Sequence, residues 1–140
     1  MKKATTLIAF ILLAIFSISA QSIVGKWKTI DDETGEEKSV VEIFKRGNKF
    51  YGKIVDIKDS SKKNNLCKLC PDSRKDQPVL GMEIIKDLEQ DGDDFEDGTI
   101  LDPNNGKVYD CKIWLEDKNT LNVRGYVAFF YRTQEWIRVD

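Results

Sequence analysis

Short segments in which apolar and polar residues alternate recur along this chain, and turn-forming residues separate them. Alternation with a period of two places the two sets of side chains on opposite faces of a β-strand. The clearest segment is 107–116, whose inward-facing residues are expected to be Tyr109, Cys111, Ile113 and Leu115. We find neither an amphipathic helical pattern nor an internal repeat, so the pattern favours an all-β fold.

The alternation predicts eight strands, which span residues 24–30, 39–45, 50–57, 79–88, 95–101, 107–116, 121–127 and 130–139. Residues 58–78 lose the pattern and form the one long loop, after the third strand. Strands joined mostly by hairpins suit an up-and-down antiparallel barrel, because closure removes the edge strands that an open sheet exposes. A barrel of this size either fills its interior with side chains or keeps a cavity for one small ligand.

The first twenty residues have the features of a secretory signal peptide. Lys2 and Lys3 precede an apolar run over 7–16, and small residues at 17–20 offer a cleavage position. The apolar run is shorter than the roughly 18 residues that a membrane-spanning helix needs. We therefore expect a signal peptide over 1–20 and a single barrel domain over 21–140. The product is expected to be exported to the periplasm or secreted, and not to span the membrane.

The composition excludes several classes of function. The 22 basic and 24 acidic residues give a formal net charge of −2 without a basic stripe, which argues against nucleic acid as a partner. There is no histidine, which excludes Ser-His-Asp, Cys-His and His-ligated zinc chemistry. The acidic segment 87–98 has glycine where a calcium loop needs its bidentate glutamate, so we expect a solvated turn there. No pair of carboxylates stands out as an acid–base couple. The sequence favours a non-enzymatic function, with no catalytic residue, cofactor or metal.

Cys67 and Cys70 lie close together within the long loop. In an exported protein, the default interpretation of this pair is a local disulfide that fixes the loop. A thiol oxidoreductase is a second interpretation, and it would need a stabilised thiolate. A zinc site is a third, and it would need further ligands such as Cys111 and Asp72, whose geometry nothing in the sequence determines.

Several blocks of the chain resemble one family of exported bacterial proteins. They are VGKW at 24–27, PVLG at 78–81, GTILDPNNGKVY at 98–109, LNVRGY at 121–126 and RTQEWIR at 132–138. They resemble the domain of unknown function 2147 family (DUF2147), with Phe95 at a position where family members often carry tryptophan. The resemblance implies a lipocalin-like barrel without an assigned activity.

The opening Gly25-Lys26-Trp27 is also similar to the lipocalin signature. In lipocalins this tryptophan closes the floor of the barrel, and an arginine from the last strand lies across it. The resemblance implies that Arg138 is this partner, with Arg132 as the second candidate. A guanidinium over an indole contributes roughly 0.5 to 2 kcal/mol, so the pair is expected to stabilise closure.

Three functional hypotheses follow, and the first is a carrier of a small apolar or amphipathic ligand inside the barrel. Its expected lining residues are Tyr51, Tyr109, Ile113, Leu115, Val123 and Phe129. The main alternative is an envelope protein-interaction or structural module without a cavity ligand, which would use the cysteine loop or the exposed aromatics Trp114, Tyr126 and Tyr131. A contiguous exposed apolar patch would favour the module, and an internal void would favour the carrier. The weaker alternative is the thiol oxidoreductase.

Overall fold

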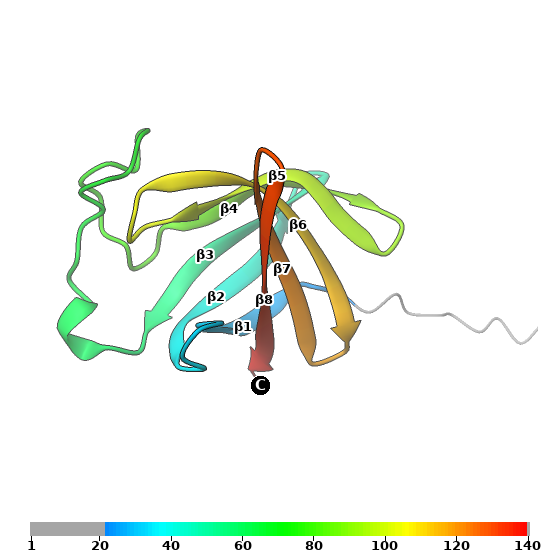
Figure 1. The fold of residues 1–140 in the computed structure, drawn as a ribbon, viewed down its shortest axis with the longest axis horizontal. Helices are drawn as coiled ribbons and strands as arrows, with labels where there is room; N and C mark the ends of the chain where they lie inside the picture. Colours follow the sequence, from blue (N-terminus) through cyan, green and yellow to red (C-terminus); the bar gives the residue numbers. More distant parts are fainter. Residues whose placement is uncertain (1–21, 140) are drawn as a thin grey trace, which may run out of the picture.

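The computed structural model describes residues 22–139, and the expected signal peptide lies outside them. Eight antiparallel strands follow one another and close into a barrel in chain order, with β8 paired to β1 (Figure 1). They are β1 (Gly25–Ile30), β2 (Glu37–Arg46), β3 (Lys49–Ile57), β4 (Glu83–Asp91), β5 (Asp94–Asp102), β6 (Lys107–Asp117), β7 (Thr120–Val127) and β8 (Phe130–Val139). The prediction of an eight-stranded up-and-down barrel is confirmed.

The fourth strand differs most from its prediction, since β4 begins at Glu83 and not at residue 79. Residues 79–82 form a tight turn in which the Met82 amide donates to the Val79 carbonyl at 3.1 Å. The long loop therefore spans 58–82, includes the short 3₁₀ helix η1 (Ser60–Lys62), and projects from one side of the barrel (green in Figure 1). Within 22–139, no helix has the length and apolar character needed to cross a membrane.

Alternating strand directions give the barrel two ends. The closed end holds the segment before β1, the turns after β2, β4 and β6, and the last residues of β8. The other end, which we call the mouth, holds the turns after β1, β5 and β7 together with both ends of the long loop. Any candidate site must therefore belong to one of the ends, the interior or the outer face.

The interior between the two ends is filled with side chains. Gly52 is the inward position on β3, and a Cβ there would lie 2.9 Å from Ile85 Cδ1 and 3.2 Å from Val41 Cγ1. Phe50 and Phe95 pack edge to face, with ring centroids 4.9 Å apart. The side chains that are fully buried include Trp27, Val41, Ile43, Ile85, Leu88, Ile113 and Leu121. In the described chain this part of the barrel is a packed core and not a ligand chamber.

Candidate functional site

At the closed end, Arg138 on β8 lies over Trp27 on β1. The guanidinium carbon is 4.2 Å from the centre of the indole, and the indole Nε1 donates to the Ile23 carbonyl at 2.8 Å. A Cβ at Gly25 would lie 3.1 Å from Arg138 Nη1, so this position suits a residue without a side chain. Arg138 also donates to three backbone carbonyls, those of Ser22, Val24 and Lys118. These bonds join the segment before β1 and the last residues of β8 to the β6–β7 turn, which is a structural role.

Arg132, the second candidate for the closing arginine, lies instead at the mouth. Its guanidinium bonds to the carboxylate of Asp32 and also pairs with Glu33 at 3.3 Å, both in the β1–β2 turn. The hydrogen bond from Arg132 lowers the pKa of Asp32 below its ordinary value. The alternative assignment of Arg132 is therefore wrong, because its position near the start of β8 puts it at the opposite end from Trp27.

The structure does not bring the six predicted lining residues together. Ile113 and Val123 are buried in the packed core, and Leu115 packs against it. Tyr109 is half-buried near the mouth. These four share the inward face of β6 and β7, where Ile113, Val123 and Leu115 pack with the core and Tyr109 lies above them near the mouth.

Two of the six predictions are wrong. Tyr51 lies on the outer face of β3, because its neighbours Phe50 and Gly52 occupy the inward positions, and its hydroxyl donates to Asp87 Oδ1 at 2.9 Å. Phe129 lies in the turn between β7 and β8 and is 98% exposed. A residue in a turn has no strand alternation to direct its side chain inward.

Inward-facing apolar side chains of β5 to β8 stay exposed at the mouth, above the packed core. The inward row of β7 continues from Val123 through Gly125 to Val127, which pairs with Phe130 of β8. Val127 is 51% exposed and Phe130 is 79% exposed. A Cβ at Gly125 would meet the side chains of Tyr109, at 3.3 Å, and Ile100, at 3.8 Å. We call this set the mouth patch: Ile100, Tyr109, Val127 and Phe130.

Polar groups border the mouth patch. The Tyr109 hydroxyl accepts a hydrogen bond from Asn105 Nδ2 at 3.2 Å, from the β5–β6 turn. Arg132 pairs with Gly125 in the β7–β8 ladder and so lies on the same face. An apolar surface with a few polar groups at its edge is the usual composition of a small-molecule site. The alternation in the sequence predicted that Tyr109 faces inward. It did not predict the exposure of Val127 and Phe130, because that depends on where the packed core ends.

The outer face of β6, β7 and β8 carries a cluster of aromatic side chains. Arg124 lies between Trp114 and Tyr131, with its guanidinium carbon 4.8 Å and 4.3 Å from the two ring centres. Tyr126 contacts Tyr131, with ring centroids 6.0 Å apart. The three aromatics proposed from the sequence for an interaction module therefore lie on one face of the barrel.

Cys67 and Cys70 form a disulfide, which confirms the prediction of a cross-linked loop. Cys67 is inaccessible to solvent and Cys70 is 2% exposed. A thiol oxidoreductase needs a sulfur that a substrate can reach, and burial does not favour that alternative. Cys111 is a separate free thiol, and its burial raises its pKa to about 12. Within 22–139, no three Cys, Asp or Glu side chains group as metal ligands.

We expect the purified protein to reduce insulin disulfides no faster than the uncatalysed reaction. The buried Cys67–Cys70 bond cannot meet a substrate disulfide unless the loop first opens. The measurement is insulin turbidity in the presence of dithiothreitol, with thioredoxin as the positive control. Turnover that disappears in a Cys70→Ser variant would contradict the structural assignment of the disulfide.

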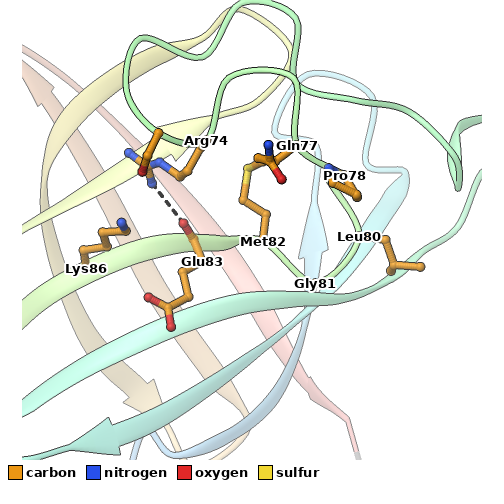
Figure 2. Close-up of a pocket in the computed structure, with 9 residues that line it drawn as sticks. Arg74, Gln77, Pro78, Leu80, Gly81, Met82, Glu83 and Lys86 are labelled. Carbon is orange, nitrogen blue, oxygen red and sulfur yellow. Dashed lines mark hydrogen bonds between the residues drawn. The ribbon is translucent and has the colours of Figure 1, made fainter.

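The disulfide loop and β4 border an open recess of about 300 Å³, shown in Figure 2. We call it the loop recess, and its lining includes Ser73, Arg74, Gln77, Pro78, Leu80, Met82, Glu83 and Lys86. Arg74 is 8% exposed and bonds to the Asp72 carboxylate and to the Glu83 carbonyl. The hydrogen bonds from Arg74 lower the pKa of Asp72 to about 2. Sequence reasoning missed this recess, because only the folded loop brings Arg74 beside β4.

Comparison with known proteins gives a family and a fold. The family model described as "Uncharacterized protein conserved in bacteria (DUF2147)" matches residues 25–138. A solved structure described as "Protein HP1028 from the human pathogen Helicobacter pylori belongs to the lipocalin family" is similar with a TM-score of 0.74 at 21% identity, over 85% of this chain and 84% of that chain. No curated protein sequence is significantly similar to this one. The chain therefore has a lipocalin-like barrel and belongs to the DUF2147 family of bacterial proteins.

Proposed function

We propose that this is an exported protein that binds a small apolar or amphipathic molecule at the mouth of its barrel. The observation that carries the proposal is the mouth patch, in which inward-facing apolar side chains remain open to solvent. The signal-like residues 1–20 support export. The lipocalin-like fold adds support by analogy, since barrels of this kind often hold one small ligand.

The packed core favours the mouth over the interior as the binding position. Ile113 and Val123, two of the expected lining residues, already contact other core side chains, so a ligand there would have to displace them. Val127 and Phe130 have no such cover. Covering about 200 Å² of apolar surface gains on the order of 5 kcal/mol before the costs of association. The site therefore suits a modest affinity.

An amphipathic ligand fits the mouth better than a hydrocarbon. The apolar part would cover Val127 and Phe130, while the Tyr109 hydroxyl and Asn105 amide offer hydrogen bonds to a polar end. Arg132 is engaged by two carboxylates, those of Asp32 and Glu33, so its positive charge is already neutralised and is not free for an anionic ligand. A ligand with an uncharged polar end is therefore the preferred class.

A Phe130→Ser variant is expected to bind the neutral apolar dye Nile red about tenfold more weakly than the wild type. The substitution removes an exposed ring from the mouth patch, and a loss of about 1.4 kcal/mol corresponds to this factor. Ile137→Ser is the matched control, since Ile137 is an exposed apolar residue on the outer face of the same strand. Dye affinity is measured by fluorescence titration.

Equal dye affinity in both variants would place binding elsewhere and reject the mouth. Native mass spectrometry of protein purified from its own envelope provides a test without a dye. A co-purifying adduct that Phe130→Ser loses and Ile137→Ser keeps is the expected result. No adduct and no saturable dye binding would leave the carrier hypothesis without support.

The outer aromatic cluster supports a second candidate, an envelope interaction module. Trp114 and Tyr131 each pack against the Arg124 guanidinium on one sheet face, and aromatic residues and arginine are enriched where proteins bind each other. A Trp114→Ala variant separates the two candidates. If the mouth is the functional site, the variant should bind Nile red like the wild type. If the outer face is the functional site, the variant should no longer capture an envelope partner.

A further inference from the structure

We propose that the loop recess is a separate binding site for a small organic anion, which it holds through a carboxylate or phosphate group. The recess lies on the outer side of β4 beneath the disulfide loop (Figure 2). It shares no residue with the mouth patch. The inference therefore stands whether or not the mouth binds a ligand.

Arg74 provides the directional donors of this site. Its Nε and Nη2 donate to the Asp72 carboxylate, at 2.9 Å and 2.6 Å, and its Nη1 donates to the Glu83 carbonyl at 2.9 Å. A guanidinium has five N–H groups, so two of them have no partner among residues 22–139. The buried, doubly anchored group is held in place before any ligand arrives, which lowers the entropic cost of binding.

Lys86 on β4 supplies a positive charge that forms no direct ion pair in the described residues, although it helps to lower the pKa of the nearby Asp72 and Glu83 carboxylates. No carboxylate of residues 22–139 lies within 4.0 Å of the Lys86 ammonium, whereas Lys53 and Lys112 on neighbouring parts of the sheet each form an ion pair. Figure 2 shows the Lys86 ammonium directed toward the Arg74 side of the recess. The Glu83 carboxylate points the other way in the same view and pairs with Arg46 at 2.7 Å. Because Asp72 pairs with Arg74 and Arg46 pairs with Glu83, Lys86 is the one charged residue of the described lining without a direct ion pair.

The chemistry of these groups selects an oxyanion. Paired guanidinium N–H groups match the geometry of carboxylate and phosphate oxygens, and an ammonium adds a point charge. Gln77 and Ser73 lie in the same lining and can donate further hydrogen bonds. Pro78, Leu80 and Met82 form the apolar part of the lining, which suits the carbon portion of the ligand. A volume of about 300 Å³ restricts the ligand to a small molecule.

The disulfide loop holds the recess together. The Cys67 amide donates to the Gln77 carbonyl at 2.8 Å, and the Asp76 amide donates to the Cys67 carbonyl at 2.7 Å. The bond between Cys67 and Cys70 therefore fixes the segment that carries Arg74 and Gln77. The long loop thus has a role beyond connecting two strands, since it positions the donors of the site.

The test is titration with acetate and with inorganic phosphate, followed by nuclear magnetic resonance of ¹⁵N-labelled protein. We expect saturable shifts confined to residues 72–86. In Lys86→Gln the dissociation constant for the better anion should rise about tenfold, the usual effect of losing one charge-assisted contact. Lys26→Gln is the matched control, since it makes the same charge change at an exposed position of β1 away from the recess. That variant should change the constant less than twofold.

Failure of this site is distinguishable from failure of the mouth. The Phe130→Ser variant should titrate with anions like the wild type, and Lys86→Gln should bind Nile red like the wild type. Shifts spread over the whole surface, or equal constants for Lys86→Gln and Lys26→Gln, would overturn the proposal. Both lysine variants are surface changes, and unchanged amide spectra without anion verify that they fold.

Discussion

Replacing Trp27 by alanine should lower the free energy of unfolding by about 3–5 kcal/mol, the range for removing a buried aromatic side chain. The indole is fully buried at the closed end and contacts the core on one side and the Arg138 guanidinium on the other. Truncation leaves a cavity, and it also removes the donor to the Ile23 carbonyl. Arg138 also loses its contact with the indole ring, so the substitution weakens the closure of the barrel as well as the packing of the core.

Trp114→Ala is the matched control for Trp27. Trp114 is a tryptophan on the outer face of β6 and is half-exposed, so its removal creates no internal cavity. We expect a loss of about 1 kcal/mol or less, mostly from its contact with Arg124. Urea unfolding followed by circular dichroism measures both variants. Equal losses in the two variants would show that Trp27 does not close the barrel floor as the contacts indicate.

A Gly98→Ala substitution should cost about 3 kcal/mol, at the upper end of the effects of overpacking. Gly98 is buried on β5, and a Cβ there would lie 2.3 Å from the Lys86 carbonyl oxygen and 2.8 Å from the Leu88 amide nitrogen. Both obstacles are backbone atoms of β4, so no rotamer change can relieve the clash. The two strands would have to separate at this point and lose ladder hydrogen bonds.

Gly125→Ala tests whether any added methyl on the inner face is equally harmful. Its Cβ would lie 3.3 Å from the Tyr109 Cβ, a tight contact with a side chain that is only half-buried. Because the displacement needed is small and Tyr109 lies near the open mouth, where β6 can yield slightly, we expect a loss of less than about 1 kcal/mol. The stabilities of the two variants are compared by urea unfolding, in which a lower midpoint concentration with an unchanged m-value reports a lower free energy of unfolding. A milder effect at Gly98 than at Gly125 would contradict the close approach of β4 and β5.

The candidate sites were less predictable than the strands, for a reason visible at Tyr51 and Phe129. Alternation in a strand shows which residues share a face. It does not show clearly which face is the inner one when an inward position is occupied by glycine. On β3 one of the inward positions is Gly52, which has no side chain, and Tyr51 beside it was predicted to line the interior instead. Phe129 falls between the predicted strands 121–127 and 130–139, where no alternation directs a side chain, and the structure shows it exposed in the β7–β8 turn.

From the sequence alone, the period of alternation and the turn residues determined the number and order of the strands, and the close spacing of Cys67 and Cys70 favoured a disulfide over a redox or zinc site. These features depend on residues close together in the chain, which a sequence displays, whereas barrel closure was inferred because it removes exposed edge strands. The filling of the interior, the exposure of Val127 and Phe130, and the meeting of Arg74 with Lys86 were decided only by the tertiary structure. They depend on side-chain volumes from strands far apart in sequence, and on a loop path that no local pattern records.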